Sequence, residues 1–141
     1  AHRRCCAPPP PPPPSPPRAP LSRLPLALSI ASNASLDAFA EATNTKPDSR
    51  RFRINIIIDG DTPFAEEGLI GTTLRCGDAL LLVKEAVGRC AAINVDPTTA
   101  KRNPEDYVRF MKAHFGQSNL GIFAEVINGG VIRVGDRLQP A

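Results

Sequence analysis

Gly88-Arg89-Cys90-Ala91-Ala92-Ile93-Asn94-Val95-Asp96-Pro97 is the stretch that joins two apolar runs of this 141-residue chain. The run before it, residues 79–83, follows the turn pair Gly77-Asp78 and has the length of a strand. The second run, residues 90–95, is shorter and ends at Asp96-Pro97. We therefore predict two strands that bend near Gly88.

Cys90 lies at this corner, where a side chain can face the mouth of a pocket. Its thiolate is the form that attacks electrophiles and binds metals, and a neighbouring cation such as Arg89 favours that form. Adjacent residues of a strand point to opposite faces, however, and free cysteines are commonly small core residues. The spacing leaves both interpretations of Cys90 open.

Residues 52–58 form the clearest strand pattern, in which apolar side chains alternate with Arg53 and Asn55. This alternation predicts that Arg53 and Asn55 share one face. A guanidinium fork gives bidentate hydrogen bonds to phosphate or carboxylate, and an amide both donates and accepts. The pair is able to bind a polar cofactor, or it is simply the solvent side of a half-buried strand.

The remaining pattern predicts a mainly β (α+β), barrel-like domain with two short helices. Further strands are expected at residues 26–30, 73–76, 120–127, 131–134 and 137–138. One helix is expected over residues 36–42, after a choice of N-cap residues at 32–35, and its N-terminus either holds an anion or is ordinarily capped. The other runs from an Asn103 cap to about Phe115.

Four further side chains, Glu66, Glu67, Cys76 and His114, belong to residue types that often carry chemistry. Glu66 and Glu67 resemble a general acid, but adjacent carboxylates without a histidine are typical of solvated charge, so we place them outside the site. Cys76 is interpreted as a structural residue, and His114, near a helix end, likewise.

Residues 1–25 differ in composition from residues 26–141, which we expect to form one domain. Eleven of the 16 prolines, and four arginines without any acid, lie in residues 1–25. Proline fixes φ and removes a donor, so this segment is predicted to be disordered or polyproline II. Its composition also fits an organelle transit peptide, so the location is left open between the cytoplasm and, if this segment is part of a targeting signal, an organelle such as the mitochondrion.

Composition argues against several classes of function. Once residues 1–25 are set aside, 13 basic and 14 acidic residues remain, and the chain has no tryptophan, so no nucleic-acid surface is expected. The longest early apolar stretch, residues 24–31, is too short to span a bilayer. The four cysteines lack CxxC spacing and the chain has two histidines, which argues against a disulfide framework and a structural zinc site.

An ordered series of motifs resembles the MOSC domain, the carboxy-terminal module of molybdenum cofactor sulfurases, which also occurs in the mitochondrial amidoxime-reducing component. The motifs are Arg51–Gly60, Phe64–Glu67, Ile70-Gly71, Gly88–Cys90, Asn94–Pro97, Phe123–Val126 and Ile132–Asp136. Each is weak alone, and their order is specific. The resemblance covers about residue 25 to the end and implies a MOSC-type β-barrel-like fold that is incomplete at its amino-terminal side.

The resemblance also implies a cofactor, molybdenum–molybdopterin, and a set of residues that bind it. Cys90 matches the thiolate that ligates molybdenum in the reductase branch, as the catalytic and metal-binding residue. Arg53, Asn55, Gly88, Arg89 and Phe123 match positions that line the pterin, although Ile54 replaces the usual proline and Phe123 stands where many relatives have tyrosine. Pyridoxal phosphate is not expected in this chain.

Two functions of different class follow from the resemblance. One is an enzyme: a reductase of N-hydroxylated substrates or a sulfur-transfer protein, served by electron-transfer proteins or by a cofactor-handling enzyme. The alternative is a non-catalytic cofactor carrier or an inactive fragment. Cys90 and Arg53 fit both functions.

Overall fold

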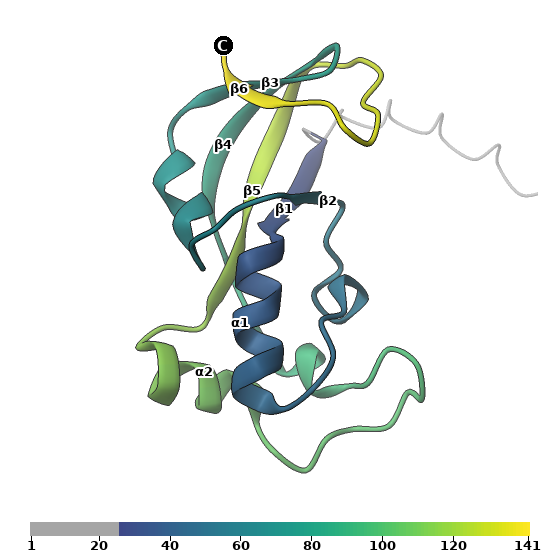
Figure 1. Cartoon of the computed structure of the whole chain (residues 1–141), viewed down its shortest axis with the longest axis vertical. Coiled ribbons are helices and arrows are strands. Elements are labelled where there is room, and N and C mark those ends of the chain that lie inside the picture. Colours follow the sequence, from purple (N-terminus) through teal and green to yellow (C-terminus); the bar gives the residue numbers. More distant parts are fainter. Residues whose placement is uncertain (1–25) are drawn as a thin grey trace, which may run out of the picture.

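The computed structural model describes residues 26–141, so the predicted proline-rich tail lies outside the described residues. Six strands and two α-helices alternate with three short 3-10 helices (Figure 1). In chain order the elements are β1 (Ala27–Ser32), α1 (Asn33–Thr43), η1 (Ser49–Phe52), β2 (Ile56–Ile58), η2 (Ala65–Leu69), β3 (Thr73–Cys76), β4 (Ala79–Gly88), η3 (Ala91–Asn94), α2 (Tyr107–Phe115), β5 (Asn119–Asn128) and β6 (Leu138–Pro140).

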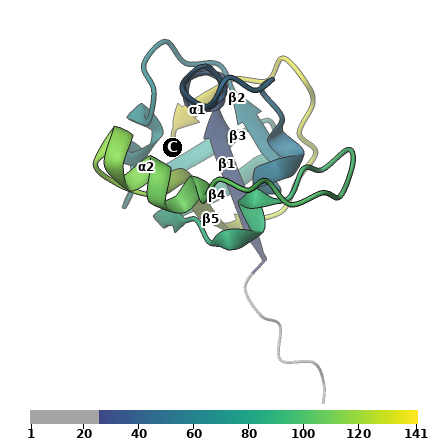
Figure 2. The same cartoon turned by 90° about the horizontal axis from the view of Figure 1, so that it is seen from below.

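The strands form one sheet in the order β2-β1-β5-β4-β3-β6. β1 and β2 are parallel, and every other neighbouring pair is antiparallel. The sheet curls into a half-barrel, with α1 and α2 in the lower half of Figure 1 and the β3–β6 end in the upper half. Seen from below in Figure 2, α1 is viewed end-on and α2 crosses in front of the strands. The prediction of a mainly β, barrel-like domain with two short helices is confirmed.

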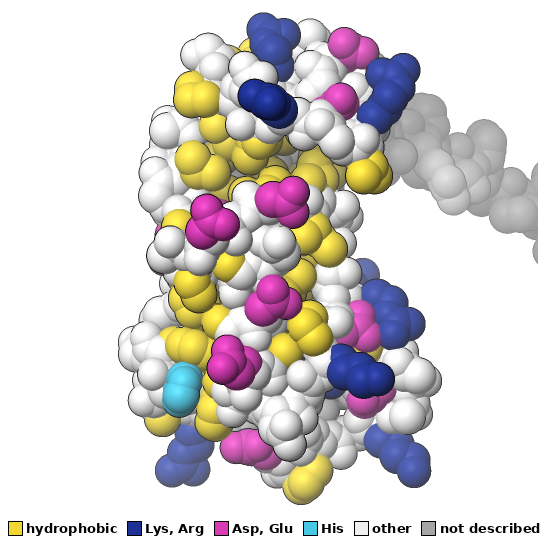
Figure 3. All heavy atoms as spheres, in the orientation of Figure 1, with side chains coloured by type: hydrophobic (Ala, Val, Ile, Leu, Met, Phe, Trp, Pro, Cys, Tyr) yellow, Lys and Arg dark blue, Asp and Glu magenta, His cyan; other side chains and the backbone are white. Residues whose placement is uncertain are grey.

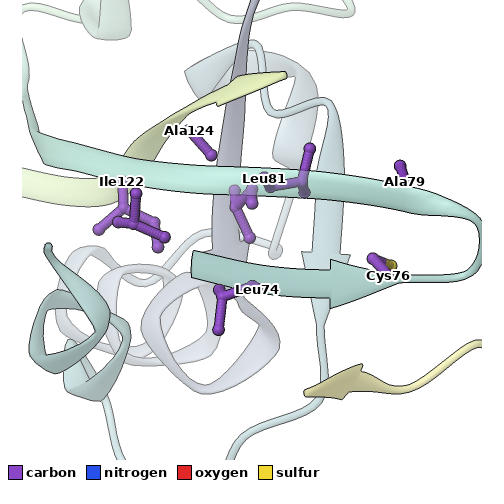
Figure 4. Packing of buried hydrophobic residues seen from close by; sticks show 8 residues of the cluster. Leu74, Cys76, Ala79, Leu81, Ile122 and Ala124 are labelled. Carbon is purple, nitrogen blue, oxygen red and sulfur yellow. The ribbon is translucent and has the colours of Figure 1, made fainter. Parts of the chain in front are cut away.

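The inner face of the sheet carries the first of two apolar clusters. Ile30, Leu74, Leu81, Val83 and Ile122 are at most 1 % exposed there, and they come from β1, β3, β4 and β5 (Figure 4). Burying one such leucine or isoleucine stabilises the fold by about 1.5–3 kcal/mol. The period-2 pattern of β4 places Leu81 and Val83 on one face of that strand.

A second cluster joins the helices to the lower end of the sheet. Phe39 of α1 meets the Phe52 ring edge-on at 4.9 Å and the Tyr107 ring at 5.3 Å. Met111 of α2 and Leu120 of β5 are fully buried beside them. Such edge-to-face aromatic pairs add about 0.5–1.5 kcal/mol each beyond the area that they bury. This cluster holds η1 close to the sheet.

The half-barrel leaves one open side between its two edge strands, β2 and β6. A groove of about 1170 Å³ runs there, floored by apolar side chains such as Leu28, Ile56 and Leu74 and bordered by residues 132–137. On the face of the molecule in Figure 3, Lys and Arg side chains gather at the two ends, with Asp and Glu side chains between them. None of the helices within residues 26–141 is both long enough and apolar enough to span a bilayer.

Several predicted elements are confirmed. The hairpin over Gly77-Asp78 pairs β3 with β4, and Leu74 lies opposite Leu81. α1 covers the predicted helix and begins three residues earlier, because the Ser32 hydroxyl accepts the Ser35 N–H at 3.1 Å and caps it. α2 ends at Phe115 as predicted.

Four local predictions are wrong. Residues 90–95 form η3 and its flanks instead of a strand, because within residues 26–141 their pairing is limited to one isolated bridge between Val95 and Arg102. The chain bends over residues 53–55, because Arg53 adopts a left-handed conformation (φ 53°) at the end of η1, so only Ile56–Ile58 of the predicted strand is a strand. Residues 131–134 are irregular, since the Asp136 carboxylate accepts the Arg133 N–H at 2.7 Å and closes a turn.

The fourth wrong prediction is the cap of α2. Asp106 caps this helix, and its carboxylate accepts the N–H groups of Val108 and Arg109. Asn103 is engaged before the helix begins: its own N–H donates to the Asn94 carbonyl at 2.7 Å, and its side chain accepts the Glu105 N–H at 3.0 Å. Tertiary contact with η3 therefore decides where α2 begins.

Candidate functional site

The Cys90 corner begins where β4 ends. Gly88 is the last residue of β4 and lies opposite Asn119 of β5. Cys90 is extended (φ −118°, ψ 177°) and immediately precedes η3, and its thiol is free and exposed. Cys90 is therefore not a core residue. Cys76, by contrast, is buried in the first cluster, and burial, followed by the charge of Asp136, raises the pKa of its thiol.

The Arg89 side chain extends into the protein, toward β5 and η1. Its Nε and Nη2 donate to the Leu120 carbonyl, and its Nη1 donates to the Phe52 carbonyl at 2.7 Å. The guanidinium also lies over the Phe52 ring, 5.3 Å from the centroid. Burial lowers the pKa of Arg89 to about 10, so the group stays charged near neutral pH. Three of its five N–H donors are therefore engaged by backbone carbonyls.

Arg53 and Asn55 are connected through Ser29 of β1 and do not share a strand face. The Ser29 hydroxyl lies 2.8 Å from the Arg53 carbonyl, and the Asn55 Oδ1 accepts the Ser29 N–H at 2.9 Å. Within residues 26–141, no hydrogen bond or ion pair engages the Arg53 guanidinium or the Asn55 amide nitrogen. Arg53 is one of the few non-glycine residues with positive φ, a strained conformation that is frequent at functional sites.

Phe123 completes the set on β5. It pairs with Ser29 of β1 on one side and with Glu85 of β4 on the other, and 36 % of it is exposed. The Ser29–Phe123 pair alternates with the Ile30–Ile122 pair, which faces the core, so Ser29 and Phe123 face outward.

Gly121 shows that the Arg89 guanidinium lies on the same outer face. A Cβ added at Gly121 would lie 3.4 Å from the Arg89 Nη2 and 2.7 Å from the Ile30 carbonyl oxygen. Gly121 also has φ +87°, which favours glycine. The site therefore requires a residue without a side chain at this position.

These contacts bring the predicted site residues into one region. Arg89 extends from the Cys90 corner to Phe52, the residue before Arg53. Ser29 of β1 is hydrogen-bonded to Asn55 and lies opposite Phe123 of β5. Within the described part of the chain, no hydrogen bond or ion pair joins two of the predicted side chains directly. The region presents a thiol, a guanidinium, an amide and an aromatic ring to solvent.

Sequence reasoning missed the role of two residues, Ser29 in this region and Glu66 at the N-terminus of α1. Ser29 lies in an apolar run and gives no signal, although it holds both Arg53 and Asn55. Glu66, interpreted from the sequence as solvated charge, is 3 % exposed, so that prediction is wrong. Its motif in the ordered series was the available signal.

Glu66 occupies the N-terminus of α1. Its carboxylate accepts the Ser32 N–H at 3.2 Å, the Ser32 hydroxyl at 3.1 Å and the Ser35 hydroxyl at 2.8 Å, while the Ser35 oxygen accepts the Phe64 N–H at 2.7 Å. Of the two possibilities left open for this terminus, both have a counterpart: Ser32 caps the helix, and the place of an anion is taken by the chain's own carboxylate. Burial, followed by repulsion from Glu66, raises the pKa of the neighbouring Glu67.

Comparison with known proteins agrees with this fold. Residues 25–139 match the model of the MOSC domain, and the chain belongs to that family. It is similar to the molybdenum cofactor sulfurase of Drosophila mojavensis, with 41 % identity over 73 residues, and to that of Danio rerio, with 32 % identity over 74 residues. Each match covers 52 % of this chain and 9 % of the sulfurase.

A solved structure shows the same fold. YiiM from Geobacillus stearothermophilus superposes with a TM-score of 0.62 and 17 % identity, over 84 % of this chain and 60 % of YiiM. Family membership and the sulfurase relatives support a function related to the molybdenum cofactor. The chain spans only a small part of the sulfurases that it matches.

Proposed function

We propose that this domain binds the molybdenum cofactor, with the Cys90 thiolate as a ligand to molybdenum, as a reductase or sulfur-transfer component. The observation that carries the proposal is an exposed, free thiol in the same region as the Arg53 guanidinium and the Asn55 amide nitrogen, neither of which has a hydrogen-bond partner within residues 26–141. A soft thiolate suits a metal that already has sulfur ligands.

The residues present fit such a cofactor. The Arg53 guanidinium would bind the phosphate, because it is exposed and, within residues 26–141, has no ion-pair partner. The Asn55 amide nitrogen would donate to the pterin, since Ser29 holds the oxygen of that amide and fixes its orientation. Gly88 would allow close approach at the end of β4, and the exposed Phe123 would pack against the ring system.

The roles of the chain's residues are to bind and to orient. The cofactor supplies a redox-active metal when bound. Arg89 remains charged near neutral pH, and its hydrogen bonds to the Phe52 and Leu120 carbonyls hold the backbone beside Cys90 in place. A reductase role requires an electron-transfer partner, and a sulfur-transfer role requires a cofactor-handling enzyme.

A carrier that holds the cofactor without turnover is the second candidate. It is favoured by one observation: none of the six predicted residues carries a carboxylate or an imidazole, the groups that most often transfer protons in catalysis. Glu85, which pairs with Phe123 across β4 and β5, is the nearest carboxylate in the register.

Cys90→Ser tests the proposal, with Cys76→Ser as the matched control. The protein is produced in a host that makes the cofactor, and molybdenum content, the metal–thiolate absorption band and reduction of an N-hydroxylated substrate are measured. We expect Cys90→Ser to lose the band and the turnover and to keep some pterin, because a hydroxyl is a hard ligand that stays protonated. Cys76→Ser should keep the band.

The outcomes separate the two functions. Turnover by the wild-type protein supports the reductase, while a loaded wild-type protein without turnover supports the carrier. A metal–thiolate band that depends on Cys76, or that persists in Cys90→Ser, would exclude Cys90 as the ligand.

A further inference from the structure

We infer that Arg51 is a positioning residue for the Cys90 thiol, and that Arg51 and Arg89 form a reciprocal clamp between the two halves of the proposed site. The halves are residues 49–55, here the Arg53 segment, and residues 88–96, here the Cys90 segment. The significance for cofactor binding rests on the proposed function, whereas the clamp itself is a property of the free protein.

Arg51 extends from the Arg53 segment to the far end of η3. Its Nη1 donates to the Ile93 carbonyl at 2.7 Å and to the Val95 carbonyl at 3.3 Å. Its Nη2 lies 3.9 Å from the Asp96 carboxylate, and only 8 % of its side chain is exposed. Hydrogen bonds from charged donors are stronger than those from neutral ones. The two carbonyls lie in the stretch that was predicted as a strand and that makes only one isolated bridge among the described residues.

The surroundings of Arg51 keep it in place. Its guanidinium lies over the Tyr107 ring, 5.3 Å from the centroid. The Tyr107 N–H in turn donates to the side chain of Asn94 at 2.8 Å, and Asn94 is 3 % exposed within η3. Arg51, Tyr107 and Asn94 therefore pack as one unit against η3, which Cys90 immediately precedes.

Arg89 makes the opposite connection. It belongs to the Cys90 segment and donates to the Phe52 carbonyl at 2.7 Å, within the Arg53 segment. Among residues 26–141, no backbone–backbone hydrogen bond joins the two segments. The polar connection between them consists of the two arginine side chains, one from each segment. Both are mostly withdrawn from solvent, so neither is available as a surface charge.

The clamp sets the spacing between the Cys90 thiol and the Arg53 guanidinium. If Arg51 is removed, the carbonyls of Ile93 and Val95 lose their donor and η3 is held from one side only. We therefore expect the Cys90 segment to open locally while the sheet remains intact.

Hydrogen–deuterium exchange of the cofactor-free protein tests the clamp. Arg51→Met keeps the length and the apolar stem of the side chain and removes its donors, and Arg75→Met, on an exposed position of β3, is the matched control. We expect the Ile93 and Val95 amides to exchange on the order of tenfold faster in Arg51→Met, with β1 and β5 unchanged. Unchanged η3 amides, or equal acceleration in the strands, would overturn the clamp.

Cofactor retention then tests the positioning role. Arg51→Met should retain less cofactor than Arg75→Met, although Arg51 does not face the proposed site. A variant whose η3 amides exchange faster but whose cofactor content equals that of the wild type would refute positioning. If the wild-type protein binds no cofactor, the proposed function fails, and the exchange result still decides whether the clamp exists.

Discussion

Removal of the buried Glu66 carboxylate, which lies at the N-terminus of α1, is expected to destabilise the domain strongly. Glu66→Ala leaves the Ser32 N–H and two hydroxyls without the acceptor that they share. The two hydroxyl oxygens are 2.9 Å apart and can partly satisfy each other, but the Ser32 N–H cannot. An unsatisfied buried donor costs about 1–3 kcal/mol, and loss of the negative charge at the helix N-terminus about 0.3–2 kcal/mol more.

The expected total for Glu66→Ala is about 3–5 kcal/mol, once the emptied volume is included. Glu66→Gln keeps the shape and one acceptor oxygen, so its expected effect is smaller, about 1–2 kcal/mol. A domain of this size has a free energy of unfolding of about 5–15 kcal/mol, so the alanine variant should lose a large, measurable part of its stability.

Urea unfolding near neutral pH measures these differences, with Glu67→Ala as the matched control. The Oε1 of Glu67 is buried without a hydrogen-bond partner among the described residues, so its removal should be neutral or stabilising. A loss below about 1 kcal/mol for Glu66→Ala, in the range of surface substitutions, would refute the argument. So would a Glu67→Ala variant that is destabilised as much.

Three further predictions follow from particular residues. The fold raises the pKa of Glu67 above 4.5, so the protonated Glu67 contributes stability below that pH, and this contribution is lost as the pH rises. Glu67→Gln should therefore be more stabilising at about pH 7 than at about pH 4. A larger gain at the lower pH in urea titrations would contradict this. Gly121→Ala should lower the free energy of unfolding by about 3 kcal/mol or more. Gly116→Ala, which also has a positive φ but has open space around it, should lower it by about 1 kcal/mol. Equal losses would show that the contact with Ile30 is unimportant. Arg53→Ala should reduce cofactor content severalfold with little change in the thermal midpoint, and unchanged content would remove Arg53 from the proposed site.

The sequence by itself determined the elements whose cause is local. The Gly77-Asp78 turn and the apolar alternation after it specify the β3–β4 hairpin and its register. A run of capping residues before an amphipathic stretch specifies α1. The order of short motifs was sufficient to indicate the family, because it depends on chain order and not on packing.

Local pattern failed where a distant residue decided the outcome. Residues 90–95 have the composition of a strand, but a strand needs a neighbouring edge, and here the carbonyls of Ile93 and Val95 are taken by Arg51, about 40 residues earlier in the chain. Arg53 and Asn55 were predicted to share one face of a strand. The left-handed conformation of Arg53 interrupts that strand, and both residues are instead hydrogen-bonded to Ser29.

The surroundings of the charged side chains were the feature that the sequence predicted least. Glu66 and Glu67 look alike in the sequence, yet Glu66 is held by two serines more than 30 residues away and Glu67 has an oxygen without a partner. Arg89 and Arg53 both match the family's site, yet Arg89 turns inward and Arg53 remains exposed. The types of residue at the site were readable from the chain, but the direction of each side chain depends on which donors and acceptors the fold places beside it, and only the tertiary structure decides that.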